Sequence, residues 1–434
     1  MTPETKDVAP ADGRAELLGL FDAAIGAVLP EVVMPSAIPG APHRKVVAIA
    51  VGKAAAEMMR VARGRSIVPL TGLVVTRYDH VPEGFAPDPG MELIEAGHPY
   101  PDENSVRAAL RALELAEGLE AGDHLLVLLS GGGSALLAAP TAGVTLADKQ
   151  ATTRLLLRSG ATIAEINSVR KHLSRIKGGR LAVAAGRAHV TTWIISDVPG
   201  DDPSYVSSGP TVADESTLQD ARDIVAKYKL SPPASVAAAL DDPANETPPG
   251  DALGLAGGEA SIIARARDAL AAAAREAERR GYAVTDLGDQ LQAEARYLGA
   301  SHAALSRRLA GDGKRRAIIS GGEATVTVVN PQGRGGRNLE YLLGLAIALN
   351  GAPGISALAC DTDGIDGTEN AAGAIVLPDT LARARKLGLD PAAHLARNDA
   401  YVFFERLGDL VVTGPTFTNV NDFRAILIEP DRGG

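Results

Sequence analysis

Residues 45–64 read KVVAIAVGKAAAEMMRVARG, an apolar strand that runs into an alanine-rich helix, with Gly52 and Lys53 at the junction. Residues 124–140, HLLVLLSGGGSALLAAP, repeat the arrangement, and here three glycines follow the strand. A run of five to seven apolar residues followed by a helical pattern is typical of a strand–helix unit. Repeated units of this kind predict a mostly parallel sheet with crossover helices.

Further strands are predicted from apolar runs elsewhere in the chain, at residues 71–76, 191–196, 315–320 and 355–359. Between residues 230 and 258, prolines and small polar residues argue against a sustained helix or strand. We therefore expect two domains, residues 1–235 and 236–434. Beyond this segment the pattern predicts two amphipathic helices flanking a strand, at residues 260–281, 282–287 and 293–310.

The predicted fold class is α/β with two α/β domains. The first is a Rossmann-like, mostly parallel sheet with helices on both faces, and the second is a smaller α/β domain. A chain of 434 residues is too long for one ordinary core. Its 46% of hydrophobic and 22% of charged residues are typical of a globular protein and exclude a disordered or fibrous chain.

Composition also narrows the location and the partners. A single cysteine, Cys360, cannot form a disulfide within the chain, which favours a reducing compartment. We see neither a signal-peptide pattern nor eighteen consecutive uncharged apolar residues, so we expect a cytoplasmic protein that does not enter a membrane. The formal charge of −10 makes nucleic acid an improbable partner, because phosphates would be repelled over most of the surface.

The loop Ser130-Gly131-Gly132-Gly133-Ser134 lies between a strand and a helix start. Glycines let a phosphate approach the main chain, and backbone N–H groups at a helix start favour an anion. The loop therefore predicts a phosphate site, and the alternative is a tight turn without a ligand. Lys53 follows the first strand, at the sheet edge where ligands bind, and could neutralise a transferring phosphoryl group or simply begin a solvated helix.

A second glycine element, Ser320-Gly321-Gly322-Glu323, follows another strand, and Arg337 lies in the first turn of the next predicted helix. A guanidinium there can clamp phosphate or carboxylate, whereas the alternative is a hairpin loop with surface arginines. No G-x-x-x-x-G-K-[ST] motif occurs, and no G-x-G-x-x-G opens a helix after the first strand. These absences disfavour P-loop NTPases and standard Rossmann dehydrogenases.

Aspartates begin where two strands end, in SDVPGDD at 196–202 and DTDGIDG at 361–367. Such carboxylates can hold Mg²⁺ or accept a proton from a hydroxyl, and Asx turns are the alternative explanation. In the segment 166–182, Arg170, Ser174 and Lys177 share one helical face, which we interpret as a solvated face rather than as the wall of a cleft. We interpret His98, beside a proline turn, as structural.

Together these segments resemble the glycerate 2-kinase family, whose members are sometimes labelled hydroxypyruvate reductase and carry a C-terminal MOFRL domain. Nine motifs in the same order cover nearly the whole chain. They are VGKAA (51–55), GHPYPDENS (97–105), LLSGGGSALL (128–137), INSVRKHLSRIKGGRLA (166–182), SDVPGDDPSYVSSGPT (196–211), SGGEATV (320–326), GRGGRNLEYLL (333–343), DTDGIDGTENAAGA (361–374) and TGPTFTNVNDF (413–423).

The resemblance implies transfer of the γ-phosphoryl group of ATP to the 2-hydroxyl of D-glycerate, with Mg²⁺, in a cleft between two α/β domains. It also implies that Lys53 and Arg337 are the cationic catalytic pair. The products would be 2-phosphoglycerate and ADP. A homodimer is compatible with this interpretation, although the residues do not reveal the oligomeric state.

We assign roles on this basis. Ser130, Ser134 and the glycines between them would bind the nucleotide, as would Gly321, Gly322 and Glu323. Asp197 is the candidate for activating the 2-hydroxyl or holding Mg²⁺, and the alternatives for the metal are Asp361, Asp363 and Asp366. Two rival functions stay open, an NAD(P)H-dependent hydroxypyruvate reductase and a non-catalytic sensor of sugar acids or nucleotides.

Overall fold

The computed structural model describes residues 13–38, 44–250, 252 and 259–430, which form two compact units. The parallel-sheet unit comprises Leu29–Arg265 and the tripeptide Phe417–Asn419. The mixed-sheet unit comprises the rest, so the first unit is inserted in the sequence of the second. Two α/β units confirm the predicted fold class. The boundary between residues 235 and 236 stays a prediction about sequence domains, whereas the contacts divide the chain after Arg265.

The sheet of the parallel-sheet unit has the order β3-β2-β1-β4-β5-β6, and all its described strand pairs are parallel. This is the strand order of the doubly wound dinucleotide-binding fold. All six residues of β1 are buried and apolar, as expected for a central strand covered on both faces. The strands are β1 (Val46–Val51), β2 (Thr71–Arg77), β3 (Met91–Ala96), β4 (His124–Leu129), β5 (His189–Ile195) and β6 (Glu259–Ala264).

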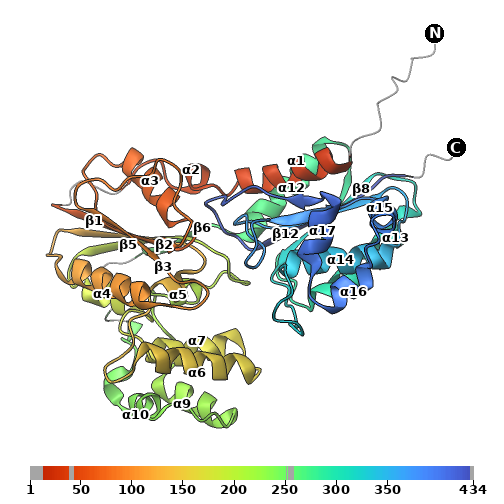
Figure 1. The fold of residues 1–434 in the computed structure, drawn as a ribbon. Coiled ribbons are helices and arrows are strands. Elements are labelled where there is room, and N and C mark those ends of the chain that lie inside the picture. The colour runs from red at the N-terminus through yellow and green to blue at the C-terminus, as the bar shows by residue number, and fades with distance from the viewer. Residues whose placement is uncertain (1–12, 39–43, 251, 253–258, 431–434) are drawn as a thin grey trace. The chain divides into compact units, whose positions relative to one another are not determined.

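Helices cover both faces of this sheet, as predicted. Figure 1 shows α3 (Ala55–Arg65) on one face and α4 (Glu103–Glu117) on the other. Alternate residues of β1, such as Val47 and Ile49, share a core with the alanines of α4. The same unit contains α2 (Pro30–Val33), α5 (Gly133–Leu136) and α8 (Arg180–Ala184).

Four further helices of this unit pack into a small helical layer with its own apolar core, which includes Leu156, Val169 and Leu240. They are α6 (Leu146–Arg158), α7 (Ile163–His172), α9 (Leu218–Lys227) and α10 (Ala234–Asp241). The expectation that residues 230–258 form no sustained helix is wrong at α10. Val236, Ala239 and Leu240 bury one face of this helix, and that packing outweighs the flanking prolines. Short 3₁₀ turns lie at Val206–Ser208 and Pro243–Asn245.

The mixed sheet has the order β11-β10-β9-β12-β8-β7. Strand β12 runs antiparallel to both β8 and β9 in the middle of the sheet, and only the pair of β7 and β8 is parallel among the described strands. The strands are β7 (Ala283–Asp286), β8 (Arg316–Gly322), β9 (Ile355–Asp361), β10 (Gly373–Val376), β11 (Leu410–Val411) and β12 (Asp422–Ile428).

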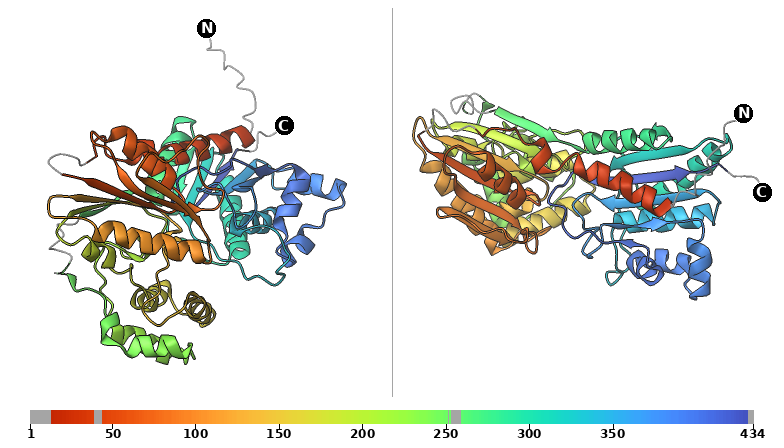
Figure 2. Two further views of the ribbon diagram at one scale, coloured as in Figure 1. Left: turned by 60° about the vertical axis from the view of Figure 1, so that its left-hand side comes forward. Right: turned by 90° about the horizontal axis from the view of Figure 1, so that it is seen from above.

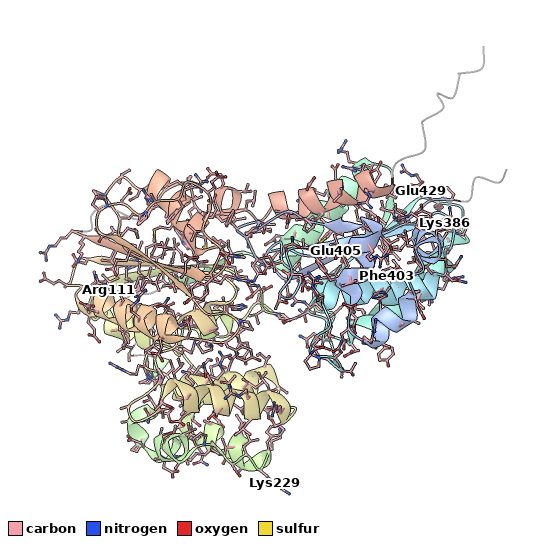
Figure 3. The ribbon with its side chains drawn as sticks, in the orientation of Figure 1. Arg111, Lys229, Lys386, Phe403, Glu405 and Glu429 are labelled. Atoms are coloured by element: carbon pink, nitrogen blue, oxygen red, sulfur yellow. The ribbon has the colours of Figure 1, made fainter. Side chains whose placement is uncertain are left out.

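Helices cover the mixed sheet on both faces. Helix α1 (Gly13–Gly26) packs against α12 (Ala266–Arg279), although the two lie far apart in the sequence, and Figure 2 shows them side by side. Helices α13 (Ala295–Ala310) and α14 (Arg337–Leu349) share a second core with Phe403, which points into the unit in Figure 3. The remaining helices are α15 (Thr380–Lys386), α16 (Pro391–Ala396) and α17 (Ala400–Leu407).

The predicted helix over residues 260–281 is wrong in its first turn and a half. Residues Glu259–Ala264 form the edge strand β6, which pairs with β5, and the helix begins at Ala266. An alanine-rich sequence carries little strand preference, so pairing with the neighbouring strand decided the outcome. Among the described residues, every helix is too short or too polar to span a lipid bilayer.

Candidate functional site

The first candidate site lies at the carboxyl ends of β1 and β4, where the strand order of the parallel sheet reverses. Ligands of doubly wound sheets bind at this position. The Lys53 amide donates to the carbonyl oxygen of Gly131 at 2.9 Å, and the Ala54 amide donates to Ser130 Oγ at 3.0 Å. These bonds fasten the segment after β1 to the glycine loop after β4, so the structure brings Lys53 and Ser130–Ser134 together.

Each of the three glycines in this loop occupies a position where a side chain would not fit without strain, and the obstacle differs between them. A Cβ atom at Gly131 would overlap Asp197 and Asn419, and one at Gly133 would overlap Ser207. Gly132 has a φ of 88° and would place a Cβ 3.1 Å from His98. Packing within the protein therefore accounts for part of the loop, as the alternative interpretation holds.

The backbone donors of this loop nevertheless point to an anion. In the part of the chain that the structure describes, we find no hydrogen-bond acceptor for the amides of Gly131, Gly132 and Gly133. Successive N–H groups without acceptors fit the oxygens of a phosphate group. Phosphate binding by this loop stays a prediction.

Asp197 follows β5 and lies beside Gly131. Its Oδ2 accepts a hydrogen bond of 2.9 Å from the amide nitrogen of Asn419, which belongs to the same unit. The structure therefore brings Asp197 next to the glycine loop, as a carboxylate whose orientation is fixed. Sequence reasoning missed Asn419. The only signal for it was its place in the last of the nine motifs.

A strained turn supports the loop from the other side. Ser207, Ser208 and Gly209 are three consecutive residues with φ of 52°, 59° and 56°. Ser207 Oγ donates to the carbonyl of Ser130 at 3.3 Å, and Ser208 Oγ lies 2.7 Å from Ser134 Oγ. Left-handed serines cost free energy and persist where surrounding structure holds them, which is common at ligand sites. Both serines were missed by the sequence analysis.

Three cations lie near one another, and one of them contacts this turn; we call them the basic cluster: Lys149, Arg170 and Lys177. Lys177 is fully buried and its Nζ donates to the carbonyl of Ser207 at 3.2 Å. Lys149 donates to Leu173 O at 3.0 Å, and Arg170 donates to Ser134 O at 3.4 Å. None of the three forms an ion pair with a described carboxylate, although the neighbouring Lys171 pairs with Asp214.

Burial controls the protonation of the basic cluster. Burial, with the positive charges of Arg170 and Arg180, lowers the pKa of Lys149 to about 7. The pKa of Lys177 is lowered well below its usual range for the same kind of reason. The prediction that Ser174 and Lys177 lie on a solvated face is wrong, because both side chains are buried.

The second region lies in the mixed-sheet unit around Arg337, the first residue of α14. Its Nε donates to Asp422 at 2.6 Å, and its Nη2 donates to Asp361 at 2.8 Å and to Asn421 at 3.0 Å. Burial would lower the pKa of Arg337, but the charges of Asp422 and Asp361 outweigh it and raise that pKa. We call this set of residues the Arg337 cluster.

The predicted metal ligands of this region have other partners. Asp366 is buried and accepts from the amides of Asn338 and Leu339 at 3.1 and 2.9 Å, so it caps α14. Burial raises the pKa of Asp366 to about 7. Asp363 accepts from the amide of Ile365 in an Asx turn. Within the described ranges no group of three or more His, Cys, Asp or Glu side chains is arranged to hold a metal.

The second glycine element differs from the first. Gly321 and Gly322 are the last residues of β8, and the Gly321 amide donates to Gly288 O at 2.8 Å. The Glu323 amide donates to Leu291 O at 3.0 Å. The Glu323 side chain is exposed. The amides of Gly321 and Glu323 are therefore engaged within the unit, and nucleotide binding here stays a prediction.

Residues 16–241 match the model of a domain of unknown function, DUF4147, and residues 316–422 match the MOFRL family. The chain is 49% identical to a protein of Agrobacterium vitis named "Putative hydroxypyruvate reductase", over 96% of this chain and 94% of that one. It is 40% identical to the D-glycerate 2-kinase of Thermotoga maritima, over 92% of this chain and 94% of that one. A crystal structure of glycerate kinase from Thermotoga maritima matches with a TM-score of 0.82 and 37% identity, covering 96% of this chain and 100% of that one.

Proposed function

The chain belongs to the DUF4147/MOFRL glycerate kinase family, and from this premise we propose that it transfers the γ-phosphoryl group of ATP to the 2-hydroxyl of D-glycerate. The products are 2-phosphoglycerate and ADP. The observation that carries the proposal is the placement of Lys53 against a loop of acceptor-free amides, at the edge of the sheet where ligands bind. The name of the Thermotoga maritima relative supports the choice of the 2-hydroxyl.

The glycine loop fits the phosphates of ATP. The amides of Gly131, Gly132 and Gly133 would hold phosphate oxygens, and Ser130 and Ser134 border them. ATP supplies the phosphoryl group when it is bound. In phosphoryl transfer the protein mainly positions the reactants and stabilises their charge, and the ammonium of Lys53 is the cation next to this loop.

Asp197 is the proposed partner of the acceptor hydroxyl. Its carboxylate, held by Asn419, could accept the hydroxyl proton or contribute one ligand to Mg²⁺, and these two roles stay alternatives. Asp361, Asp363 and Asp366 fit a shared metal site less well, because Arg337, an Asx turn and the start of α14 engage them.

Arg337 remains a proposed catalytic residue. Its guanidinium already binds two carboxylates, so a substrate anion would have to compete with Asp361 and Asp422 for it. We also propose that Gly321, Gly322 and Glu323 contribute to nucleotide binding. A cytoplasmic location and a homodimer are further predictions.

The test of the proposal is ADP release with D-glycerate, ATP and Mg²⁺, coupled either to enolase alone or to enolase with phosphoglycerate mutase. Signal with enolase alone establishes the 2-phosphoglycerate product. A signal that requires the mutase would instead indicate phosphorylation of the 3-hydroxyl. Oxidation of NADH by hydroxypyruvate without ADP release would replace the kinase by a reductase, and binding of ATP and glycerate without turnover would indicate a sensor.

A further inference from the structure

A group of polar side chains lies next to Lys53 that neither the fold nor the proposed mechanism uses. Arg77 is the last residue of β2, His80 follows it closely, and His98 comes two residues after β3. Because β1, β2 and β3 are parallel neighbours, their carboxyl ends meet at one edge of the sheet. The space beside Gly132 is bordered by both His98 and Lys53, so this group adjoins the glycine loop.

Several atoms of this group are buried without a hydrogen-bond partner. His80 is 1% exposed, and neither of its ring nitrogens has a partner among the described residues. The same holds for Nε of Arg77, and Arg77 forms no ion pair with any carboxylate that the structure describes. A buried polar atom left unpaired costs about 1–3 kcal/mol, so such atoms usually have a ligand or an ordered water.

The local charge is positive. Lys53 and Arg77 are cations, and burial together with their charges lowers the pKa of His80 to about 4 and that of His98 to about 3. Both imidazoles are therefore neutral at pH 7 and can each donate and accept one hydrogen bond. Of the nearby acids, Asp102 accepts from Tyr78 and caps α4, and Glu95 accepts from the amide of Asp79. The negative charge of Asp79 opposes the lowering of the His80 pKa without reversing it.

We propose that Arg77, His80 and His98 form the subsite that binds the carboxylate of the hydroxy-acid substrate beside Lys53. This proposal rests on the proposed function. A planar guanidinium matches a carboxylate with two parallel hydrogen bonds. The amides of the glycine loop, by contrast, match phosphate oxygens. Separate subsites for the two anions would hold the acceptor hydroxyl near the phosphoryl group, with Lys53 between the subsites.

The experiment compares the steady-state kinetics of Arg77→Gln with those of the wild-type chain. We expect the KM for D-glycerate to rise about 10- to 100-fold, because a charge-assisted contact is lost. The KM for ATP should change by less than about twofold, since the glycine loop is intact. Arg77→Lys should recover part of the glycerate affinity, because lysine restores the positive charge but not the two parallel hydrogen bonds of a guanidinium.

The matched control is Arg111→Gln in the same unit. Arg111 lies on α4, pairs with Glu92 and Glu114 and points outward in Figure 3. We expect both KM values of this variant to equal those of the wild type. An unchanged KM for glycerate in Arg77→Gln would overturn the subsite, and so would a rise in the KM for ATP alone, which would make Arg77 a phosphate ligand.

Two further measurements separate the subsite from folding and from the proposed function. If Arg77→Gln unfolds at a lower temperature, His98→Asn replaces it, and a glycerate KM that stays at the wild-type value then contradicts the proposal. If the wild-type chain releases no glycerate-dependent ADP, the proposed function fails. Calorimetric titration of D-glycerate into wild type and Arg77→Gln still tests the subsite in that case, and equal affinities would overturn it.

Discussion

Each unit buries a cluster of charge near a glycine-containing strand end, but the two clusters are balanced in opposite ways. In the parallel-sheet unit, Lys149, Arg170 and Lys177 donate to backbone carbonyls and form no ion pair with a described carboxylate. In the mixed-sheet unit, Asp361 and Asp422 form ion pairs with Arg337. Glu323 and Asp366 lie close enough to raise its pKa further.

The difference separates two uses of a buried cation. A buried charge without a counter-charge is costly, and the lowered pKa values of Lys149 and Lys177 reflect that cost. A bound anion would favour the charged forms of these lysines and would pair with Arg77. A charge that its own unit already neutralises contributes mainly to holding that unit together. The carboxylates that pair with Arg337 distinguish it from Arg77. The following predictions test this distinction, beginning with the largest effect.

Arg337→Ala should reduce the free energy of unfolding by about 3–5 kcal/mol, because it removes the guanidinium that pairs with the buried Asp361 and leaves Asp422 with Arg424 as its remaining cation. Urea unfolding of the variant and the wild type measures the change. Arg334→Ala is the control, since Arg334 pairs with Glu369 at a more exposed position. Lost activity at unchanged stability would instead show that Arg337 acts on the substrate. Both clusters would then bind anionic ligands.

Lys53→Ala should lower kcat on the order of 10²-fold or more while the unfolding temperature stays the same, because a cation that acts on developing charge contributes mainly in the transition state. Coupled ADP release and a thermal melt measure the two quantities. Lys45→Ala, at the opposite end of β1, should leave both unchanged. If the variant unfolds at a lower temperature but keeps its kcat, Lys53 has a structural role instead of a catalytic one.

Lys149→Met should remove a pH dependence of stability. The folded-state pKa of Lys149 is about 7, below the value near 10.4 in an unfolded chain. Between these values the unfolded chain binds more protons, so wild-type stability rises with pH by at most about 1.4 kcal/mol per pH unit. Unfolding curves of both proteins from pH 7 to 10 give the difference. Parallel curves would mean that Lys149 keeps its proton and has a counter-ion after all.

Asp366→Ala should lower the free energy of unfolding by about 1–2 kcal/mol, which is the usual effect of removing a side chain that caps a helix. Asp366→Asn keeps an acceptor for the amides of Asn338 and Leu339 and should recover most of the loss. Urea unfolding distinguishes them. Equal losses in both variants would indicate that the negative charge itself balances Arg337, which would tie the cap to the Arg337 cluster.

Local sequence patterns predicted the parallel sheet well, because each strand–helix unit carries its own apolar run and its own turn residues. The sequence of β6 predicts the start of a helix, and only pairing with β5 makes Glu259–Ala264 a strand. In the candidate site, Lys53, the glycine loop and Asp197 each follow a strand, and this position in the sequence was enough to predict that they lie together. The partners of Arg337 depend on which distant side chains meet, and no spacing along the chain encodes that. The same is true of Arg77 Nε and the ring nitrogens of His80, which have no partner among the described residues.

The position of α1 also has a consequence for the growing polypeptide. Leu17, Leu20 and Phe21 bury themselves in a unit whose matching helix α12 begins at Ala266, 240 positions after α1 ends at Gly26. At a synthesis rate of roughly 5–20 residues per second, these apolar side chains wait roughly 10–50 s for their partner. The inserted unit can complete its sheet during that delay. Ribosome-bound chains should therefore present α1 to holding chaperones until the final third of synthesis.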